Sequence, residues 1–358
     1  MKDYHHRAFR LNNIEYSFED LKEVAYSLVK EGEPFEREIG DFLLDWVSDR
    51  PQIAQQTSGS TGPPKTIMLE KEKMVASAKA TGAYFGMGPG TRALLCLPAH
   101  TVAGKMMWVR AMVLGWSLYY VKPSLNPLKD LEKPIDFTAL TPAQVSSSLA
   151  FLPKVGTLII GGAPVSAALL KTLQDFSAEV FETYGMTETI THVAVKPITG
   201  HKAEGHEGYF EGLPEVHFAV DKRGCLIVNA PYLSEVPIVT NDLVELLSET
   251  TFRWLGRADR VVNSGGVKIF PETLESKLSS HIKNRFFLAG IPDPELGERL
   301  VMVVEGQGEA AEILDGLKGK KLLEKHQWPK AVYFSAKFAQ TGSGKVDRIG
   351  TLKALDLG

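Results

Sequence analysis

A loop near residue 60 combines glycine, hydroxyl and lysine side chains that are suited to binding phosphate. It reads Thr57-Ser-Gly-Ser-Thr-Gly-Pro-Pro-Lys65. Glycine-freed backbone N–H groups, hydroxyls and an ammonium can together cradle phosphate oxygens. The Walker A pattern does not fit, because the fifth position after Gly59 is Pro64. A solvent-exposed linker is the alternative for this loop taken alone. The predicted phosphate contacts are Thr57, Ser58, Gly59, Ser60, Thr61, Gly62 and Lys65.

Further segments carry glycine, aromatic, hydroxyl and carboxylate side chains. Glycines at a strand end let a flat base approach the backbone, and a carboxylate is a hard ligand suited to Mg²⁺. A simple turn and a helix cap are the ordinary alternatives for such residues. The segments are Gly161-Gly-Ala-Pro164, Glu182-Thr-Tyr-Gly-Met-Thr-Glu188, Thr240-Asn-Asp-Leu243, Gly256-Arg-Ala-Asp-Arg-Val-Val-Asn-Ser-Gly-Gly-Val-Lys268 and Gln340-Thr-Gly-Ser-Gly-Lys345.

In this order, the loop and the five segments resemble the superfamily of acyl- and aryl-CoA synthetases, peptide-synthetase adenylation domains and luciferases. The resemblance extends from roughly Gln55 to Arg348. It implies an AMP-forming acid–thiol ligase that uses ATP, Mg²⁺ and CoA and forms an acyl-adenylate. A small carboxylate would be the other substrate.

The resemblance also assigns roles to single residues. Tyr184 would face the adenine, Asp242 would bind the ribose although Asn241 replaces the usual glycine, and Arg257 would help hold the nucleotide. Thr187 would contact a phosphate and Glu188 would bind Mg²⁺. The remaining nucleotide contacts would be Gly161, Gly162, Ala163, Pro164, Glu182 and Thr183.

Two further residues bear on the reaction cycle. Asp259 falls where the superfamily has its interdomain hinge, about which the small domain would rotate between the two half-reactions. Lys345 would be the mobile cation that bridges the carboxylate and the α-phosphate during adenylation. In the rotated state, the segment from Gly265 to Lys268 would lie near the CoA tunnel.

The stretch from Leu97 to Arg110 resembles the corresponding region of o-succinylbenzoate:CoA ligases of menaquinone biosynthesis. That acid has a second carboxylate, for which Lys105 and Arg110 are the candidate cations. On a helix these two positions do not share a face. Lys105 is favoured because Ala103 and Gly104 leave room beside it, and Arg110 is equally suited to a structural salt bridge. The other predicted acyl contacts are His100, Met106, Trp108, Gly185, Thr191 and His192, with His100 as a pocket-lining residue rather than a base.

Composition excludes several other classes of protein. The chain has 358 residues with a net charge of −3, which argues against general nucleic-acid binding. Cys96 and Cys225 form no metal-binding or disulfide pattern. The N-terminal residues lack the apolar stretch that is typical of a signal peptide, and the apolar stretch from Met106 to Val121 is too short to span a bilayer. We expect a cytoplasmic protein without a membrane span, and a homo-oligomer is left open.

Alternating helix and strand patterns predict an α/β fold with a mostly parallel sheet. Helices are expected near 20–28, 36–47, 71–84, 106–114 and 166–176, and strands at 92–97, 116–121 and 155–160. Shorter strands after Glu215 predict a small β-rich subdomain. We place a large domain at residues 1–258 and a smaller, mobile α+β domain at residues 259–358.

Three alternatives to this function remain open. In the first, the acid would be a fatty, short-chain or other aryl carboxylate. In the second, the acyl group would be transferred to a carrier protein rather than to CoA. In the third, the chain would be a non-catalytic nucleotide-binding relative. Lys345, Glu188 and Asp242 argue against the last. Only 56 residues precede the phosphate loop, so a partner subunit is one source for the N-terminal wall of the acyl and CoA sites.

Overall fold

The computed structural model describes residues 4–56, 65–203, 206, 208–318, 320, 322–340 and 346–357. The helices are α1 (Asp20–Glu31), α2 (Pro34–Val47), α3 (Lys71–Phe85), α4 (Val102–Leu114), α5 (Pro142–Ser148), α6 (Ala167–Leu173), α7 (Pro271–Leu278), α8 (Ala310–Leu317) and α9 (Arg348–Ala354). The strands are β1 (Arg10–Leu11), β2 (Ile14–Glu15), β3 (Gln52–Gln56), β4 (Thr66–Glu70), β5 (Arg92–Leu95), β6 (Ser117–Tyr120), β7 (Ile135–Leu140), β8 (Val155–Ile160), β9 (Glu179–Gly185), β10 (His192–Pro197), β11 (Phe210–Gly212), β12 (His217–Val220), β13 (Cys225–Asn229), β14 (Ile238–Leu246), β15 (Thr251–Arg257), β16 (Val262–Ser264), β17 (Val267–Ile269), β18 (Phe286–Asp293), β19 (Gly297–Glu305) and β20 (Ala331–Ser335).

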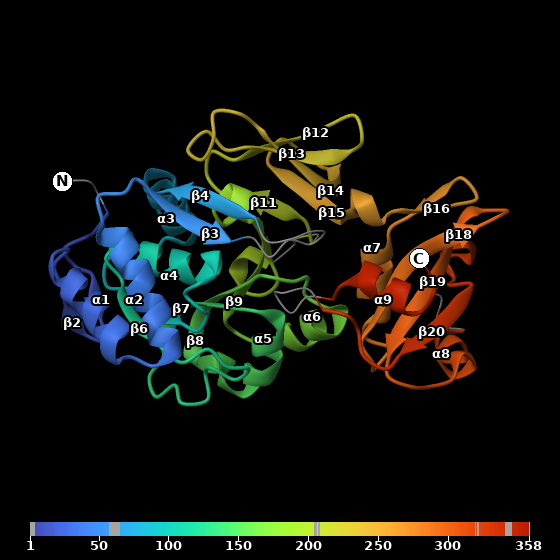
Figure 1. Ribbon diagram of the computed structural model, residues 1–358, viewed down its shortest axis with the longest axis horizontal. Helices are drawn as coiled ribbons and strands as arrows, with labels where there is room; N and C mark the ends of the chain where they lie inside the picture. The colour runs from blue at the N-terminus through green and yellow to red at the C-terminus, as the bar shows by residue number, and fades with distance from the viewer. Residues whose placement is uncertain are drawn as a thin grey trace.

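One long sheet organises the first 257 residues, in the order β12-β13-β14-β15-β11-β10-β9-β8-β7-β5-β6-β1-β2. Pairing is parallel from β1 through β6, β5, β7 and β8 to β9, which confirms the expected parallel α/β core. From β9 to β12 every pairing is antiparallel. The β-rich part is therefore continuous with the main sheet, because β10 folds back on β9 and β11 joins β15. Figure 1 shows β12 to β15 projecting from the helix-covered part.

Alternate residues of the parallel strands supply two cores, because side chains of a strand point to opposite faces. Ala93 and Leu95 of β5 pack with α1 to α4. Leu94 and Cys96 pack with α5, α6 and the 3-10 turn Leu149–Lys154. Helices thus cover both faces, which explains why strands such as β5, β7 and β8 are largely apolar.

Local side-chain contacts mark the starts of two helices, α1 and α5. At α1, the backbone N–H of Ser17 donates to Asp20 and that of Asp20 donates back to the Ser17 hydroxyl. At α5, Thr141 and Gln144 form a capping box ahead of Pro142. These local contacts explain why the helix positions are readable from sequence.

The chain after Arg257 builds a second sheet, β17-β16-β19-β18, with β20 parallel to β19. Its apolar side chains form separate clusters around Val262, Leu300 and Phe338. Figure 1 shows this unit, with α7, α8 and α9, beside the larger part of the molecule. Within the described ranges, no helix has the length and apolarity that a membrane crossing requires.

Candidate functional site

The end of β8 is kept open by two glycines. A Cβ on Gly161 would lie 2.7 Å from Oγ1 of Thr183, which itself donates to the carbonyl oxygen of Ile160. Gly162 has a φ of +84°, in the left-handed region. A side chain at Gly161 would collide and one at Gly162 would strain the backbone. The strand end is therefore free of side chains, as an approaching flat base would need.

Glu182 supports the turn that follows. Its buried carboxylate accepts the N–H of Val165 at 3.0 Å and forms an ion pair with Lys196 at 2.5 Å. Ala163 and Pro164 are exposed on the same turn. Glu182 thus holds the turn from within, while Ala163 and Pro164 face outward.

Tyr184 and Asp242 come from β9 and β14 and meet at the surface of the long sheet. The Tyr184 hydroxyl donates to Oδ2 of Asp242 at 2.7 Å, and Nε1 of Trp254 lies 3.4 Å from Oδ1. Phe252 and Phe210 pack against the Tyr184 ring. Burial, with the Asp242 carboxylate, raises the pKa of Tyr184, so its hydroxyl stays a proton donor. A carboxylate has about four acceptor positions, so Asp242 retains two.

Arg257 is the cross-strand neighbour of Asp242. Its guanidinium makes a two-pronged ion pair with Asp259, at 3.2 and 3.3 Å. Burial alone would raise the pKa of Asp259, but the Arg257 guanidinium, together with the charge of Arg260, gives a net lowering of that pKa. The predicted nucleotide arginine and the predicted hinge residue are therefore locked to each other.

A strained turn joins β9 to β10. Thr187 and Glu188 lie in a 3-10 turn, with Glu188 exposed. Ile190 then has φ +63° and ψ −57°, and the N–H of Thr191 donates to the carbonyl of Thr189 at 2.7 Å. This is a γ-turn of the rare, strained hand, occupied by a β-branched residue. Such strain persists only where the surrounding structure enforces it.

Gly185 packs closely against the residues that follow that turn. A Cβ there would collide with the carbonyl oxygen of Thr191 and lie 2.5 Å from Cα of His192. The β9–β10 register is irregular between His192 and Ala194. The chain at Gly185 therefore runs unusually close to Thr191 and His192, so three predicted acyl contacts lie together.

Arg110 points from α4 into this group. Nε lies 3.3 Å from Oγ1 of Thr81, and Nη2 lies 3.3 Å from both Oγ1 of Thr191 and Nδ1 of His192. Among the described residues, Nη1 has only the sulfur of Met107, at 3.9 Å. Arg110 is 1% exposed, and among the described residues no carboxylate lies within ion-pair distance of it. Burial lowers its pKa to about 9, still well above neutral pH, so the guanidinium remains charged.

His192 completes the network around Arg110. Because Nδ1 accepts from Arg110, the proton is assigned to Nε2, which lies 3.4 Å from Oγ1 of Thr81. Thr81 in turn donates to the carbonyl of Ser77. Burial, followed by the Arg110 charge, lowers the pKa of His192 well below its usual value. His192 is thus a neutral acceptor that orients the guanidinium.

Lys105 faces a different part of the molecule. Its Nζ donates to Oε1 of Gln55 at 2.8 Å and lies 3.2 Å from the carbonyl oxygen of Ala54. Burial lowers the pKa of Lys105, against a smaller opposing effect of Asp45. The expected divergence of Lys105 and Arg110 on α4 is therefore what the structure shows.

His100 and Trp108 lie apart from the Arg110 group. His100 is exposed, with Nδ1 at 2.8 Å from a carboxylate oxygen of Glu38. The ring of Trp108 is fully buried, and its centroid is 6.3 Å from that of Tyr120. Among the described residues, neither side chain forms a hydrogen bond or ion pair with Thr191, His192 or Gly185. Met106 is also fully buried.

The predicted phosphate contacts from Thr57 to Gly62, together with Lys345, lie outside the described residues. Lys65 begins the described chain after the loop and is exposed. Sequence analysis did not predict two partners of the candidate cations. Thr81 binds Arg110, and Gln55 binds Lys105. Thr81 carries no motif signal, because it is one hydroxyl within an ordinary helix.

Within the described ranges, no three His, Cys, Asp or Glu side chains cluster as a metal site would. Mg²⁺ is commonly held by one or two carboxylates together with substrate phosphates. The exposed carboxylate of Glu188 fits that type of site, which needs no cage of protein ligands.

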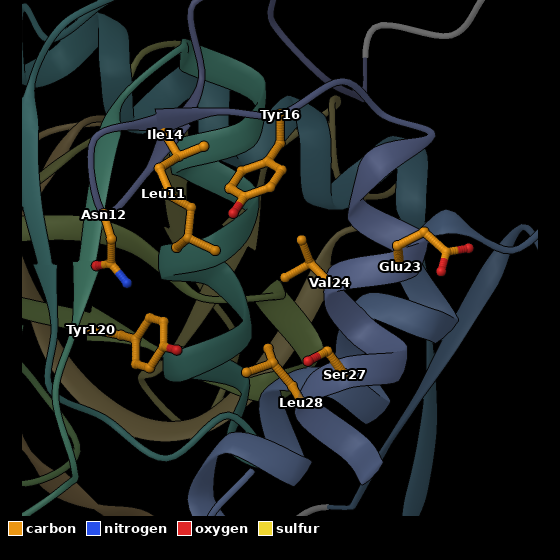
Figure 2. A pocket seen from close by; sticks show the side chains of 9 residues that line it. All are labelled: Leu11, Asn12, Ile14, Tyr16, Glu23, Val24, Ser27, Leu28 and Tyr120. Atoms are coloured by element: carbon orange, nitrogen blue, oxygen red, sulfur yellow. The ribbon is translucent and has the colours of Figure 1, made fainter. Parts of the chain in front are cut away.

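A hollow of about 390 Å³ lies elsewhere, between β1, β2, α1 and β6. Figure 2 shows Tyr120, Leu11, Val24 and Leu28 around it, with the carboxylate of Glu23 directed away. None of the predicted site residues that the structure describes lines it. We therefore place the candidate site at the ends of β8 and β9 and beside Asp242 in the middle of β14, rather than at this hollow.

Comparison with known proteins gives a consistent family. The family model described as AMP-binding enzyme matches residues 23–221. A solved structure of an acyl-CoA synthetase (AMP-forming)/AMP-acid ligase II-like protein from Dyadobacter fermentans is 35% identical, with a TM-score of 0.61. The match covers 93% of this chain and 98% of that one.

More distant relatives share one description. A probable 2-succinylbenzoate–CoA ligase of Mycobacterium tuberculosis is 28% identical over 329 residues, covering 86% of this chain and 85% of the relative. The o-succinylbenzoate coenzyme A synthetase of Bacillus subtilis, solved with ATP and magnesium, has a TM-score of 0.74 at 19% identity. That match covers 94% of this chain and 82% of the other, and at this identity it shows a shared fold.

Proposed function

The chain belongs to the AMP-binding enzyme family, and we propose that it is an AMP-forming ligase that joins o-succinylbenzoate to CoA. In the first step a carboxylate oxygen of the acid attacks the α-phosphorus of ATP, and pyrophosphate leaves. In the second step the CoA sulfur attacks the acyl carbon and AMP leaves. The relative described as a probable 2-succinylbenzoate–CoA ligase supports this choice of acid.

The observation that carries the proposal is the buried Arg110. A cation removed from water is costly unless an anion or several acceptors compensate it. Arg110 has three neutral oxygen or nitrogen acceptors, which take up Nε and Nη2, while Nη1 meets only a sulfur among the described residues. We infer that Nη1 binds the carboxylate of o-succinylbenzoate that does not react. Lys105 was favoured from sequence, but its ammonium is held by Gln55 and Ala54.

The nucleotide would lie at the open ends of β8 and β9. Gly161 and Gly162 leave room for adenine beside Tyr184, and the two remaining acceptor positions of Asp242 match the two ribose hydroxyls. Arg257 would help hold the nucleotide. Thr187 and the phosphate loop would contact the phosphates. Mg²⁺ held by Glu188 would neutralise phosphate charge.

The domain movement between the two half-reactions would involve Asp259 as the hinge and Lys345 as the mobile cation. We propose residues 1–258 and 259–358 as the two domains, with rotation at Asp259 between the half-reactions. Replacing Lys345 with alanine should abolish pyrophosphate release yet largely spare thioester formation from supplied acyl-adenylate. Equal loss of both half-reactions would contradict the rotation.

The Arg110→Met variant tests the acid directly. Two substrates are compared in a pyrophosphate-release assay: o-succinylbenzoate and 4-oxo-4-phenylbutanoate, which lacks only the ring carboxylate. A hydrogen-bonded charge is worth roughly 1.5–3 kcal/mol, so KM for o-succinylbenzoate should rise about 10- to 100-fold. KM for the monocarboxylate should change little. Methionine preserves apolar packing, and such replacements of buried ions are often tolerated.

Two results would overturn the proposal. Equal effects of Arg110→Met on both acids would remove Arg110 from the carboxylate site. Wild-type protein that turns over benzoate or octanoate better than o-succinylbenzoate would point to another acid. Transfer to a phosphopantetheine carrier in preference to free CoA would instead indicate a carrier-charging enzyme.

A further inference from the structure

Two lysines are buried at opposite ends of the β3–β4 hairpin. Within the described chain this hairpin is a sheet of two strands, and no hydrogen-bonded ladder joins it to the long sheet. Its placement therefore depends on side chains. Ile53 and Leu69 pack into the core, and Lys105 and Lys71 each contribute a buried polar contact.

Lys105 holds the end of β3 that leads into the phosphate loop. Nζ binds Oε1 of Gln55 and the carbonyl of Ala54, as described above. The amide nitrogen of Gln55 donates to the carbonyl oxygens of Gln56 at 2.9 Å and His100 at 3.1 Å. Lys105 and Gln55 are 9% and 5% exposed. Together they tie the start of α4 to the last three residues of β3.

The position of this tie matters because Gln56 and Thr66 form the last pair of the β3–β4 ladder. Residues 57–65 leave directly from that pair. Any shift of Gln55 moves the point from which the phosphate loop departs. Misplacing contacts by about 1 Å is enough to lower catalysis substantially.

We propose that Lys105 is a positioning residue for the nucleotide half of the site, acting through Gln55 on the phosphate-binding loop, and not a ligand of the acid. The inference rests on the proposed ATP-dependent function. The two buried cations of α4 would then have different roles. Arg110 points toward Thr191 and His192 of the proposed acyl site, whereas Lys105 points toward the end of β3 that precedes the phosphate loop.

The test uses Lys105→Met with Lys71→Met as the matched control. Lys71 is 1% exposed and donates to the carbonyl of Ser48 at 2.7 Å, at the end of the hairpin away from the loop. Each variant loses one buried ammonium. Lys105→Met should raise KM and the equilibrium Kd for ATP about tenfold, with less than a twofold change in KM for the acid. Lys71→Met should lower stability without changing ATP binding.

A double-mutant cycle supplies the second readout. If Lys105 acts through Gln55, the two losses should not add. The Lys105→Met/Gln55→Leu double variant should then bind ATP as tightly as whichever single variant has the lower affinity for ATP. Additive losses would show that the two residues act separately and would overturn the proposal. A raised KM for the acid with unchanged ATP binding would make Lys105 a substrate ligand instead. A failure of the proposed function would be distinguishable from these outcomes. In that case the wild-type protein would release no pyrophosphate with any of the acids.

Discussion

The hydroxyl of Tyr184 donates a hydrogen bond to Oδ2 of Asp242 across 2.7 Å, joining β9 to β14. These residues stand 58 positions apart in the sequence. The contact fixes the carboxylate that we assign to the ribose and the ring that we assign to the adenine. Two nucleotide contacts are thus oriented before ATP arrives, which lowers the entropy lost on binding.

Tyr184→Phe should therefore weaken ATP binding while leaving the ring in place. Loss of one hydrogen bond to a carboxylate predicts a rise in the Kd for ATP of roughly tenfold, and KM for the acid should stay nearly constant. Isothermal titration with ATP measures the first value and steady-state kinetics the second. An unchanged Kd would show that Asp242 needs no orientation by Tyr184.

Because of the γ-turn at Ile190, we expect the glycine variant at this position to be more stable than the alanine variant, which is the reverse of the usual order. Both Ile190→Ala and Ile190→Gly lose a buried side chain, at a cost of about 2–5 kcal/mol. Glycine adopts positive φ without steric penalty, whereas alanine does not. The glycine variant should be the more stable by roughly 1 kcal/mol in urea unfolding. The usual order, with alanine more stable, would mean that the turn is unstrained.

Gly256 lies immediately before the Arg257–Asp259 pair and has a φ of +149°. A Cβ would also lie 2.7 Å from Oε2 of Glu272, whose other oxygen binds Arg260. Gly256→Ala should lower the free energy of unfolding by about 1–3 kcal/mol. The control is Gly316→Ala in α8, where nothing lies within 4 Å of the added carbon. That variant should be stabilised by roughly 0.5–1 kcal/mol.

His192 predicts a loss of stability in mild acid. Its pKa is about 6.5 when unfolded and well below that value when folded. Above pH 7 both states are neutral, so the residue has no pH-dependent effect there. As the pH falls below 6.5, the unfolded state gains the proton first and is stabilised. The free energy of unfolding should therefore fall as the pH is lowered from 7.5 to 5.5, because the unfolded state takes up the proton more readily than the folded state.

His192→Asn keeps an acceptor near the position of Nδ1 and removes the titration. The variant should lose correspondingly less stability over the same pH interval. Comparing the two proteins cancels the contributions of His5 and His206, whose pKa values burial also lowers. Parallel stability curves for the two proteins would contradict the buried, neutral state of His192.

The helices, the parallel strands and the family were predictable from sequence because their signals are local. A capping pattern such as Ser17 to Asp20 acts within one turn. Apolar runs such as residues 155–160 mark strands covered on both faces. The ordered glycine-rich and acidic segments predict the AMP-binding family, which the family match confirms. None of these signals depends on how distant elements pack.

The direction of each cation on α4 was decided by tertiary structure. Sequence spacing indicates that Lys105 and Arg110 lie on different faces, but it does not show which face meets the acyl site. That depends on the packing of α4 against α3, β3 and the β9–β10 turn, which brings Thr81, Gln55 and His192 from distant positions. The sequence alone thus determined the family and its motifs, whereas packing decided which side chains those motifs meet, because burial and partner choice arise from contacts between elements.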